Sequence, residues 1–331
     1  MSYQPLTTST VTSETVTSDS IVTDFFAKDS AAPDLSLKQA SPISPIQTHF
    51  NANLQDNLIS DIEQTDPTQY QRRFQGTQTL YGTTAFDVFA AAHVIVIGIG
   101  GVGSWVAEGL ARTAVGTITL IDLDVLVASN VNRQLPALDS TFGQSKIAAM
   151  GARVSEINPR VRLHLVDDFL TPENVATLLP SREAAKVAAA DNRPIIILDC
   201  VDDMQAKLAI ALHCRFNKLK LICAGGAGGK IDPRQITVSD LKDSYQDPLL
   251  ARLRSKLRFE KGINSTLKEK FGIKCVYSTE PPRVDKSCQT GGLHCGGYGS
   301  AVAVTSVVAM IMVSEALQML TQHAAKSTTL H

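Results

Sequence analysis

The sequence lacks the cysteine pattern of a structural zinc site. Its 331 residues include six cysteines, and no two of them form a C-x-x-C pair. A zinc site built from two such pairs is therefore excluded. The chain also lacks the cationic, apolar start that is typical of a secretion signal. Reduced cysteines and a cytoplasmic location are the expectation that follows.

Residues 1–68 have little positive charge and little hydrophobic periodicity. They hold nine Asp or Glu and two Lys, a balance of −7, and they are rich in Ser, Thr, Asp and Gln. They also lack the Arg that a mitochondrial presequence would carry. This composition predicts a disordered acidic tail at 1–68, followed by a folded domain at 69–331.

The folded part has a different composition. The whole chain has a net charge of −1 and is 44% hydrophobic, which is ample for a sizeable core. Subtracting the tail leaves 29 Lys or Arg against 23 Asp or Glu, or about +6. A mildly basic body of this kind is compatible with an anionic partner such as RNA.

Long apolar runs are scarce, and one near the C-terminus is long enough to cross a membrane. Residues 300–322 are nearly all apolar until Glu315. Their Ser, Thr, Ala and Glu content also fits the core helix of a globular domain, and no membrane anchor flanks them. A core helix is therefore expected, and membrane insertion is not.

From Tyr70 onward the chain alternates between strand and helix patterns. This alternation predicts an α/β fold with a Rossmann-like, mainly parallel sheet, helices on both faces and a less regular C-terminal part. Strands are expected at 94–97, 117–122, 162–166, 194–199, 220–223 and 235–238. Helices are expected around 72–74 and at 85–92, 102–114, 146–157, 172–179, 204–217 and 247–261, and residues 183–190 form an Ala-rich segment.

A glycine motif follows the first of these strands. Gly98, Gly100 and Gly103 have the G-x-G-x-x-G spacing, and the motif opens a helix. The first glycine permits a sharp turn, the second lets the backbone approach phosphate, and the third lets helix and strand pack closely. Asp122 ends the next strand, where a carboxylate can accept ribose hydroxyls. The motif alone does not distinguish between NAD, FAD and ATP.

Charged residues further along favour ATP over a redox cofactor. Arg133 lies in the loop after the second strand, with Asn130 before it, and Lys146 opens the following helix. Asp202 follows another strand at its carboxyl end, the edge at which such sheets bind ligands. Two cations with a carboxylate that can hold Mg²⁺ suit attack on an ATP phosphate. Hydride transfer has little use for them.

Several stretches resemble a known superfamily. Residues 98–104, 122–124, 130–134, 143–146 and 199–202 resemble the ubiquitin-activating-enzyme-like (ThiF/MoeB-type) adenylyltransferases. Within this superfamily the chain is most similar to the tRNA threonylcarbamoyladenosine dehydratases. The stretches that carry this similarity are 73–82, 101–105, 166–172, 225–233 and 275–280.

The resemblance implies a site for ATP and Mg²⁺, with a monovalent cation as a further candidate. It also implies a homodimer in which one subunit supplies an arginine to the other, for which Arg73 is the first candidate and Arg72 the second. The resemblance implies that Asp122 binds the ribose and that Asn130 orients the phosphates. Arg133 and Lys146 would neutralise phosphate charge, and Asp202 would bind Mg²⁺. The remaining residues of the implied nucleotide-binding loop are Gly98, Gly100, Gly101, Gly103 and Gln134.

The resemblance also implies the reaction and the partners. ATP would activate the carboxylate of threonylcarbamoyladenosine beside a tRNA anticodon, and intramolecular ring closure would remove one water. The partners would be tRNA carrying that modification and, by resemblance only, proteins of a cysteine desulfurase relay. The nearest rival function is an adenylyltransferase for a ubiquitin-like sulfur carrier. An NAD-dependent oxidoreductase and an inert nucleotide-binding scaffold are more distant rivals.

Two further features each allow two interpretations. Cys275 is either a nucleophile that carries an acyl intermediate or a buried structural thiol, and ring closure itself needs no enzyme nucleophile. The segment 251–275 holds eight Lys or Arg and two Glu, which suits either an RNA phosphate backbone or a solvated helix face.

Overall fold

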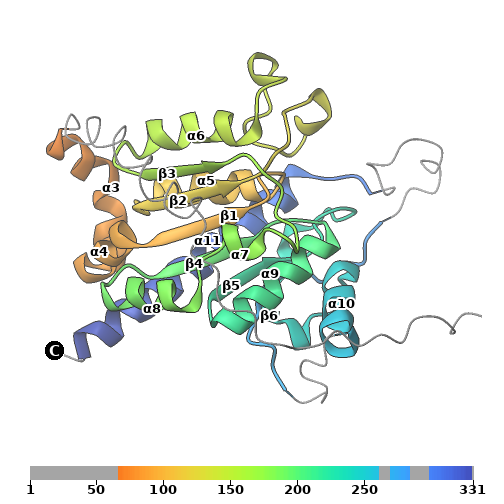
Figure 1. Ribbon diagram of the computed structural model, residues 1–331. Helices are drawn as coiled ribbons and strands as arrows, with labels where there is room; N and C mark the ends of the chain where they lie inside the picture. The colour runs from red at the N-terminus through yellow and green to blue at the C-terminus, as the bar shows by residue number, and fades with distance from the viewer. Residues whose placement is uncertain (1–65, 261–268, 284–297, 330–331) are drawn as a thin grey trace, which may run out of the picture. The chain divides into compact units, whose positions relative to one another are not determined.

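One seven-stranded sheet organises the described part of the chain, in the order β3-β2-β1-β4-β5-β7-β6 (Figure 1). The computed structural model describes residues 66–260, 269–283 and 298–329, all within the unit Asn53–His331. Nearly all of the expected tail, 1–65, lies outside the described residues. The strands are β1 (His93–Ile97), β2 (Thr117–Ile121), β3 (Arg162–Val166), β4 (Ile195–Asp199), β5 (Lys220–Ala224), β6 (Ile236–Asp240) and β7 (Lys274–Ser278).

The sheet is mainly parallel, as the alternation predicts. Strands β3, β2, β1, β4, β5 and β7 run in one direction, and β6 pairs antiparallel with β7. The less regular C-terminal part thus extends the same sheet. Strand β7 is not predicted from the sequence. The strand begins within the basic segment 251–275, and residues 279–283, directly after it, form no helix that would mark a β-α repeat.

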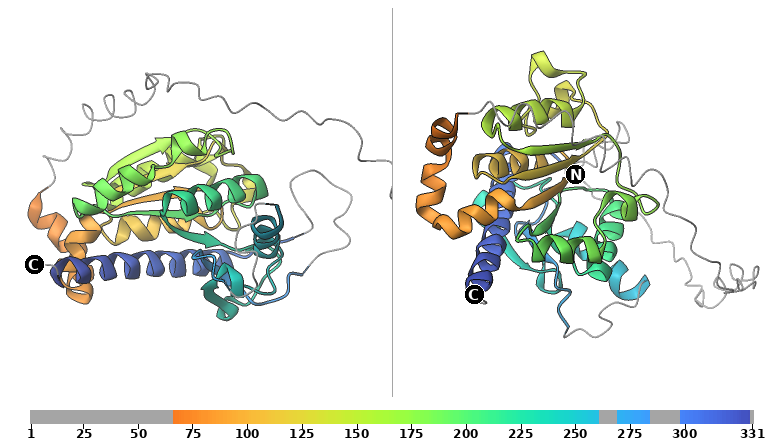
Figure 2. Two further views of the ribbon diagram at one scale, coloured as in Figure 1. Left: turned by 60° about the horizontal axis from the view of Figure 1, so that its bottom comes forward. Right: turned by 60° about the vertical axis from the view of Figure 1, so that its left-hand side comes forward.

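Helices cover both faces of the sheet, as expected (Figures 1 and 2). They are α3 (Pro67–Tyr81), α4 (Thr83–Ala91), α5 (Gly103–Arg112), α6 (Lys146–Ile157), α7 (Val175–Leu178), α8 (Arg182–Ala190), α9 (Met204–Asn217), α10 (Pro248–Ser255) and α11 (Val302–Thr329). The expected helix at 247–261 ends as α10 at Ser255, and residues Lys256–Glu260 continue as a short π-helix.

Alternate strand residues divide the core into two layers, because successive side chains of a strand point to opposite faces. Val94 and Val96 pack with α4, α5, α6 and α11. Ile95 and Ile97 pack on the other face with α7, α9 and α10. Strands buried on both sides need continuous apolar runs, which explains why these strands lack polar alternation.

Helix α11 is the apolar C-terminal run, and it packs against the sheet and against α4 and α5 (Figure 2, left). Val304, Val308, Met312 and Leu320 are each at most 2% exposed. Among the described residues, Val302–Lys326 is the one helix long and apolar enough to cross a membrane. Its packing against the sheet is that of a core helix, as the sequence predicts.

Candidate active site

The glycine motif forms a tight turn between β1 and α5. Gly98 has φ +84°, and its N–H donates to the carbonyl of Ile121 at 2.9 Å. A Cβ atom on Gly103 would lie 1.8 Å from the carbonyl oxygen of Gly98. Gly98 therefore allows the turn and Gly103 lets the helix start close to the strand, as the motif predicts.

Asp122 fastens this turn to the end of β2. Its carboxylate accepts hydrogen bonds from the N–H groups of Ile99 at 2.6 Å and Asp124 at 2.8 Å. The side chain is buried, and this burial raises the pKa of Asp122 against the opposing effects of Lys146 and the two N–H donors. The carboxylate thus shapes the loop and lies where the ribose of a nucleotide is expected.

Lys146 lies at the start of α6 and is buried. Its ammonium contacts the carboxylate of Asp124 at 2.7 Å, and its own N–H donates to the carbonyl of Asp124 at 3.0 Å. A chain of contacts therefore runs from Asp122 through Asp124 to Lys146. Asp124 has no role among the sequence-based candidates, although its spacing of two residues from Asp122 was a usable signal.

The loop that holds Asn130, Arg133 and Gln134 lies against the glycine turn. Arg133 donates to the carbonyl of Ser129 at 2.9 Å, and its aliphatic carbons come within 3.1 Å of the Cβ position of Gly101. The side-chain oxygen of Asn130 accepts from the N–H of Val127 at 3.1 Å, so Asn130 also shapes its own turn.

Gln134 and Trp105 complete this part of the site. Gln134 is buried, and its Oε1 has no hydrogen-bond partner among the described residues, while its Nε2 is 4.0 Å from the Cβ position of Gly100. Trp105 Nε1 donates to the carbonyl of Arg133 at 3.0 Å. The single tryptophan therefore anchors the arginine loop to α5.

Asp202 lies in the loop between β4 and α9, and it is exposed. Next to it, the side chain of Val201 is 3.0 Å from the Cβ position of Gly98, so this loop contacts the glycine turn. Asp203 caps α9 by accepting from the N–H groups of Gln205 and Ala206. Asp202 is thus left facing solvent at the carboxyl edge of the sheet, beside the nucleotide loop.

A fully buried ion pair supports the Asp202 loop. Lys207 on α9 contacts Asp199 at 2.7 Å, Cys223 Sγ at 3.4 Å and the carbonyl of Ala224 at 3.2 Å. Burial lowers the pKa of Lys207, but Asp199 and Cys223 raise it more, so it lies above its usual value. The one signal for this pair in the sequence was a lone lysine in an apolar helix.

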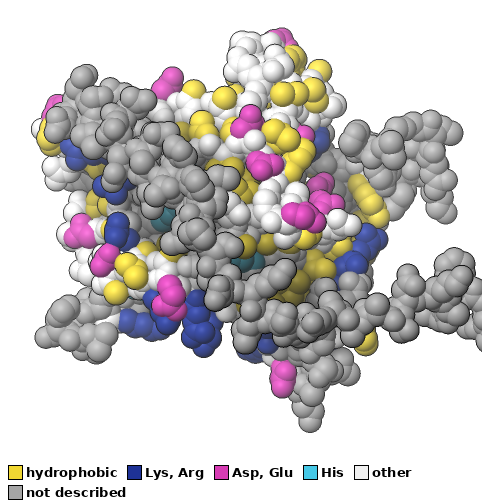
Figure 3. Space-filling view, in the orientation of Figure 1, with side chains coloured by type: hydrophobic (Ala, Val, Ile, Leu, Met, Phe, Trp, Pro, Cys, Tyr) yellow, Lys and Arg dark blue, Asp and Glu magenta, His cyan; other side chains and the backbone are white. Residues whose placement is uncertain are grey.

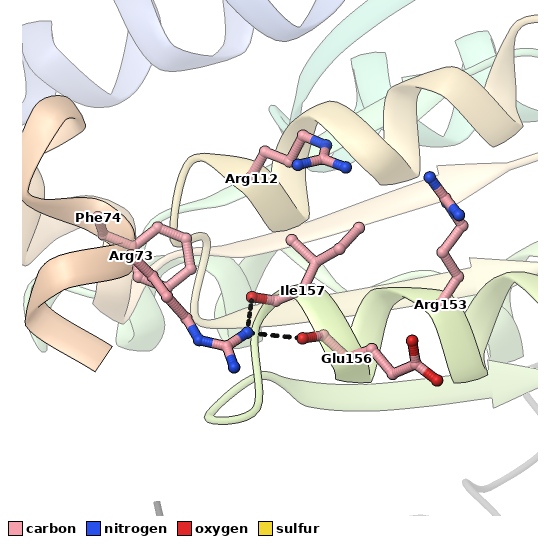
Figure 4. A pocket seen from close by; sticks show the side chains of 6 residues that line it. All are labelled: Arg73, Phe74, Arg112, Arg153, Glu156 and Ile157. Atoms are coloured by element: carbon pink, nitrogen blue, oxygen red, sulfur yellow. Dashed lines mark hydrogen bonds between the residues drawn. The ribbon is translucent and has the colours of Figure 1, made fainter. Parts of the chain in front are cut away.

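Arg73 lies apart from the other candidates in this chain. Its guanidinium donates to the carbonyls of Glu156 at 2.7 Å and Ile157 at 3.1 Å, where α6 ends (Figure 4). It lines a cavity of about 440 Å³ with Phe74, Arg112, Arg153, Glu156 and Ile157. The end of α6 precedes the start of β3, so this cavity lies at the opposite edge of the sheet from the glycine turn.

Cys275 is fully buried in β7, paired in register with Cys223 of β5. A thiol with no exposed surface does not meet a substrate, so the structural interpretation fits this geometry better than the nucleophile. The neighbouring thiol of Cys223 is likewise fully buried. Burial and the nearby Asp199 raise the pKa of Cys200 far above its usual value, which leaves it protonated.

Comparison with known proteins places this chain in a family. The family model described as "ThiF family" matches residues 70–331. The tRNA threonylcarbamoyladenosine dehydratase of Escherichia coli K12 is 42% identical over 269 residues, covering 78% of this chain and 96% of that protein. The Haemophilus influenzae protein of the same name is 39% identical, with coverage of 76% and 94%.

A solved structure agrees in fold. The Escherichia coli dehydratase in complex with ATP superimposes with a TM-score of 0.67 at 41% identity, covering 77% of this chain and 96% of that one. The glycine turn, its carboxylate and the cationic loop beside it thus occur in a chain that matches this family over nearly all of its described length. The chain belongs to the ThiF family.

Proposed function

We propose that this chain is an ATP-dependent tRNA threonylcarbamoyladenosine dehydratase. The observation that carries the proposal is the packing of the Arg133 side chain against Gly101, because it brings a cation to the glycine turn that is proposed to bind ATP. The chain spans almost the whole length of the dehydratases it resembles, and one of them has been solved with ATP. An NAD-dependent oxidoreductase has no comparable support.

The first step would be activation of a carboxylate. An oxygen of the threonylcarbamoyl carboxylate attacks the α-phosphorus of ATP, which forms an acyl adenylate and releases pyrophosphate. Asp122 would hold the ribose, while Arg133 and Lys146 neutralise charge on the phosphates. Because Lys146 is already paired with Asp124, its ammonium is held in place before ATP binds.

The second step would be ring closure. A nucleophile within the same modification attacks the activated acyl carbon, AMP leaves, and the modified nucleoside has lost one water overall. Asp202 would hold Mg²⁺ together with phosphate oxygens, since an exposed carboxylate beside a phosphate site suits that ion. A single carboxylate fits this arrangement, and no group of three His, Cys, Asp or Glu that suits a metal occurs among the described residues.

The expected partners follow from the same proposal. The substrate is tRNA with threonylcarbamoyladenosine, and a homodimer is expected because Arg73 does not reach the glycine turn of its own chain. A cytoplasmic location fits a tRNA-modifying enzyme. A monovalent cation and cysteine desulfurase relay proteins are also proposed from the resemblance. No described residue is assigned to either of them.

The direct test supplies purified protein with ATP, Mg²⁺ and threonylcarbamoyl-modified tRNA, followed by mass spectrometry of the nucleosides. ATP-dependent loss of one water supports the proposal. Asp202→Asn should lower turnover by at least about a hundredfold with ATP binding largely retained. Asp191→Asn is the matched control, because Asp191 is exposed and ends α8 at the opposite edge of the sheet.

The same assay separates the rival functions. A sulfur-carrier adenylyltransferase would exchange pyrophosphate into ATP in the presence of a carrier protein and leave the tRNA nucleoside unchanged. An inert scaffold would bind ATP without turnover. Either result with well-folded, ATP-binding protein would refute the dehydratase proposal.

A further inference from the structure

A second glycine-rich loop, Gly225–Lys230, follows β5 at the same edge of the sheet as the nucleotide turn. Strand β5 is next to β4, whose following loop carries Asp202, and β1 lies beyond β4. The loop Gly225–Lys230 therefore lies beside the proposed ATP site. A second substrate that reacts with ATP would bind next to that site.

Buried polar contacts brace this loop. The N–H of Gly226 donates to the carboxylate of Asp247 at 2.9 Å. Lys230 is 2% exposed, and its ammonium donates to the carbonyls of Gln246 and Ser278, each at 3.3 Å, and to that of Glu280. One lysine thus joins the loop to the segment before α10 and to the end of β7.

Tyr298 packs directly on the braced loop. A Cβ atom on Gly228 would lie 3.2 Å from Tyr298 Cβ, and one on Gly229 would lie 2.9 Å from Tyr298 Cδ1. The N–H of Gly229 also donates to the carbonyl of Gly299 at 2.7 Å. Glycine at both positions lets the tyrosine lie on the backbone itself.

The same short segment contacts the arginine loop of the nucleotide site. Asn132 Nδ2 donates to the carbonyl of Ser300 at 3.0 Å, immediately before Arg133. Thr305, at the start of α11, is 3.4 Å from the Cβ position of Gly101. Residues 298–300 therefore join the braced loop to the loop that is proposed to hold the ATP phosphates.

Tyr245 lies in the segment before α10 that Lys230 joins to the loop Gly225–Lys230. It precedes Gln246, whose carbonyl accepts from Lys230, and its ring meets the buried ring of Tyr277 edge-on at 6.1 Å. Tyr245 is 58% exposed and Tyr298 is 42% exposed. Two exposed aromatic rings thus lie next to residues that hold the loop Gly225–Lys230 in place.

Charge gives a less specific signal for RNA. On the face drawn in Figure 3, Lys and Arg side chains lie in separate groups, with acidic side chains between them. In the segment 251–275, Arg254 donates to the carbonyls of Leu241 and Ser244, Arg258 lies over the ring of Phe271, and Lys274 pairs with Glu315. These three cations therefore have roles within the fold.

We propose that Tyr298 and Tyr245 stack on unpaired bases of the tRNA anticodon loop and so bring the modified adenosine to the ATP site. This inference rests on the proposed function. Single-stranded RNA is commonly recognised by stacking of splayed bases on aromatic rings, which tolerates differences between tRNAs. The segment of Tyr298 also contacts the arginine loop, since Asn132 donates to Ser300, so stacking there would bring the carboxylate of the modification next to the phosphates.

The test measures turnover and binding for the single variants Tyr298→Leu and Tyr245→Leu, with Tyr298→Phe and Tyr245→Phe beside them. Each leucine variant should raise the KM for modified tRNA, and the Kd of the modified anticodon stem-loop, by about 5- to 150-fold. The Kd for ATP should stay unchanged. The phenylalanine variants should match the wild type, because stacking needs the ring and not the hydroxyl.

Phe216→Leu is the matched control, since Phe216 is 70% exposed near the end of α9, at the opposite edge of the sheet. If the leucine variants have an unchanged KM for tRNA and an unchanged Kd for the stem-loop, the stacking proposal is wrong. Turnover by the wild-type protein in the same assay would still support the proposed function. Absence of wild-type turnover would instead count against the proposed function. If Tyr298→Leu loses ATP binding through misfolding, Tyr245→Leu, on its separate support, decides the question.

Discussion

Single glycines set the geometry of the nucleotide turn, and they differ in what surrounds them. Gly103 faces the carbonyl of Gly98 at a distance that excludes any side chain, whereas Gly76 on α3 has no atom within 4 Å of its Cβ position. Both residues lie in helices. Alanine substitutions at the two positions therefore separate the effect of close packing on stability from the effect of helix propensity.

Gly103→Ala should therefore destabilise the fold by at least about 2 kcal/mol and abolish measurable ATP binding, because helix α5 must move away from β1. Gly76→Ala should stabilise the fold by about 0.5–1 kcal/mol, since alanine favours helix. Urea denaturation and ATP titration of both variants measure these effects. Normal ATP affinity in Gly103→Ala would contradict the close-packing role.

His93 illustrates a partly buried residue whose effect on stability depends on pH. It donates to or accepts from Thr119 at 2.7 Å, and burial together with the nearby His164 lowers its pKa from 6.5 to about 4. Arg162 in turn is close enough to lower the pKa of His164, after burial. Protonation of His93 is thus more difficult in the folded protein than in the unfolded chain.

Between about pH 6.5 and about pH 4 the unfolded state therefore binds more protons, and the free energy of unfolding falls as the pH falls. The contribution of His93 is about 3 kcal/mol across this window. His93→Gln keeps a polar partner for Thr119 and removes the titration, so its unfolding free energy should depend less on pH. Urea denaturation over this range makes the comparison, and parallel curves for the two proteins would rule out the effect.

At the scale of elements, helix α11 shows how a membrane-like sequence becomes a core helix. It lies against α5, where Gly109 faces the side chains of Val313 and Met310. A Cβ atom on Gly109 would be 2.9 Å from Val313 Cγ2. The small residue lets the two helices approach closely, and the apolar surface of α11 is covered by protein.

Gly109→Leu should accordingly reduce the free energy of unfolding by about 1–3 kcal/mol through overpacking of α5 against α11. Gly76→Leu is the control, because it makes the same change on a helix where the added side chain meets open space. Thermal or chemical denaturation of both variants gives the difference. Equal free energies of unfolding for the two variants would mean that α11 does not pack closely against α5 at Gly109.

At the scale of the whole molecule, the described fold begins with its own cap. The carboxylate of Asp66 accepts from the N–H of Thr68 at 2.9 Å at the start of α3. The glycine turn, the arginine loop and the Asp202 loop all come after it in the chain. Residues 1–65 have the composition expected of a disordered tail and lie outside the described residues, and the candidate site lies entirely after Asp66.

A chain that starts at Asp66 should therefore bind ATP with unchanged affinity and dehydrate modified tRNA at the same rate, with unfolding free energy within about 0.5 kcal/mol of the full chain. Parallel assays of the two chains with the same tRNA preparation provide the check. A large loss of turnover with intact ATP binding would show that the tail contributes to tRNA recognition.

The sequence by itself determined the features that depend on neighbours along the chain. Apolar runs predicted the first strands and helices, because burial on both faces leaves a local pattern. The glycine spacing predicted the turn at Gly98–Gly103, since the turn needs no distant partner. The position of Asp122 and Asp202 after strands placed both at one edge of the sheet, because parallel strands end there.

Contacts between distant segments were decided only by the tertiary structure. The pairs Asp124–Lys146 and Asp199–Lys207 depend on which strands and helices become neighbours, and a charged residue alone does not reveal its partner. Arg73 lies at the far edge because helix α3 packs beside the end of α6. Residues 298–300 contact both the loop of Asn132 and the loop of Gly229, because α11 begins where these two loops lie side by side. The loops follow different strands, so no local sequence pattern predicts that they become neighbours.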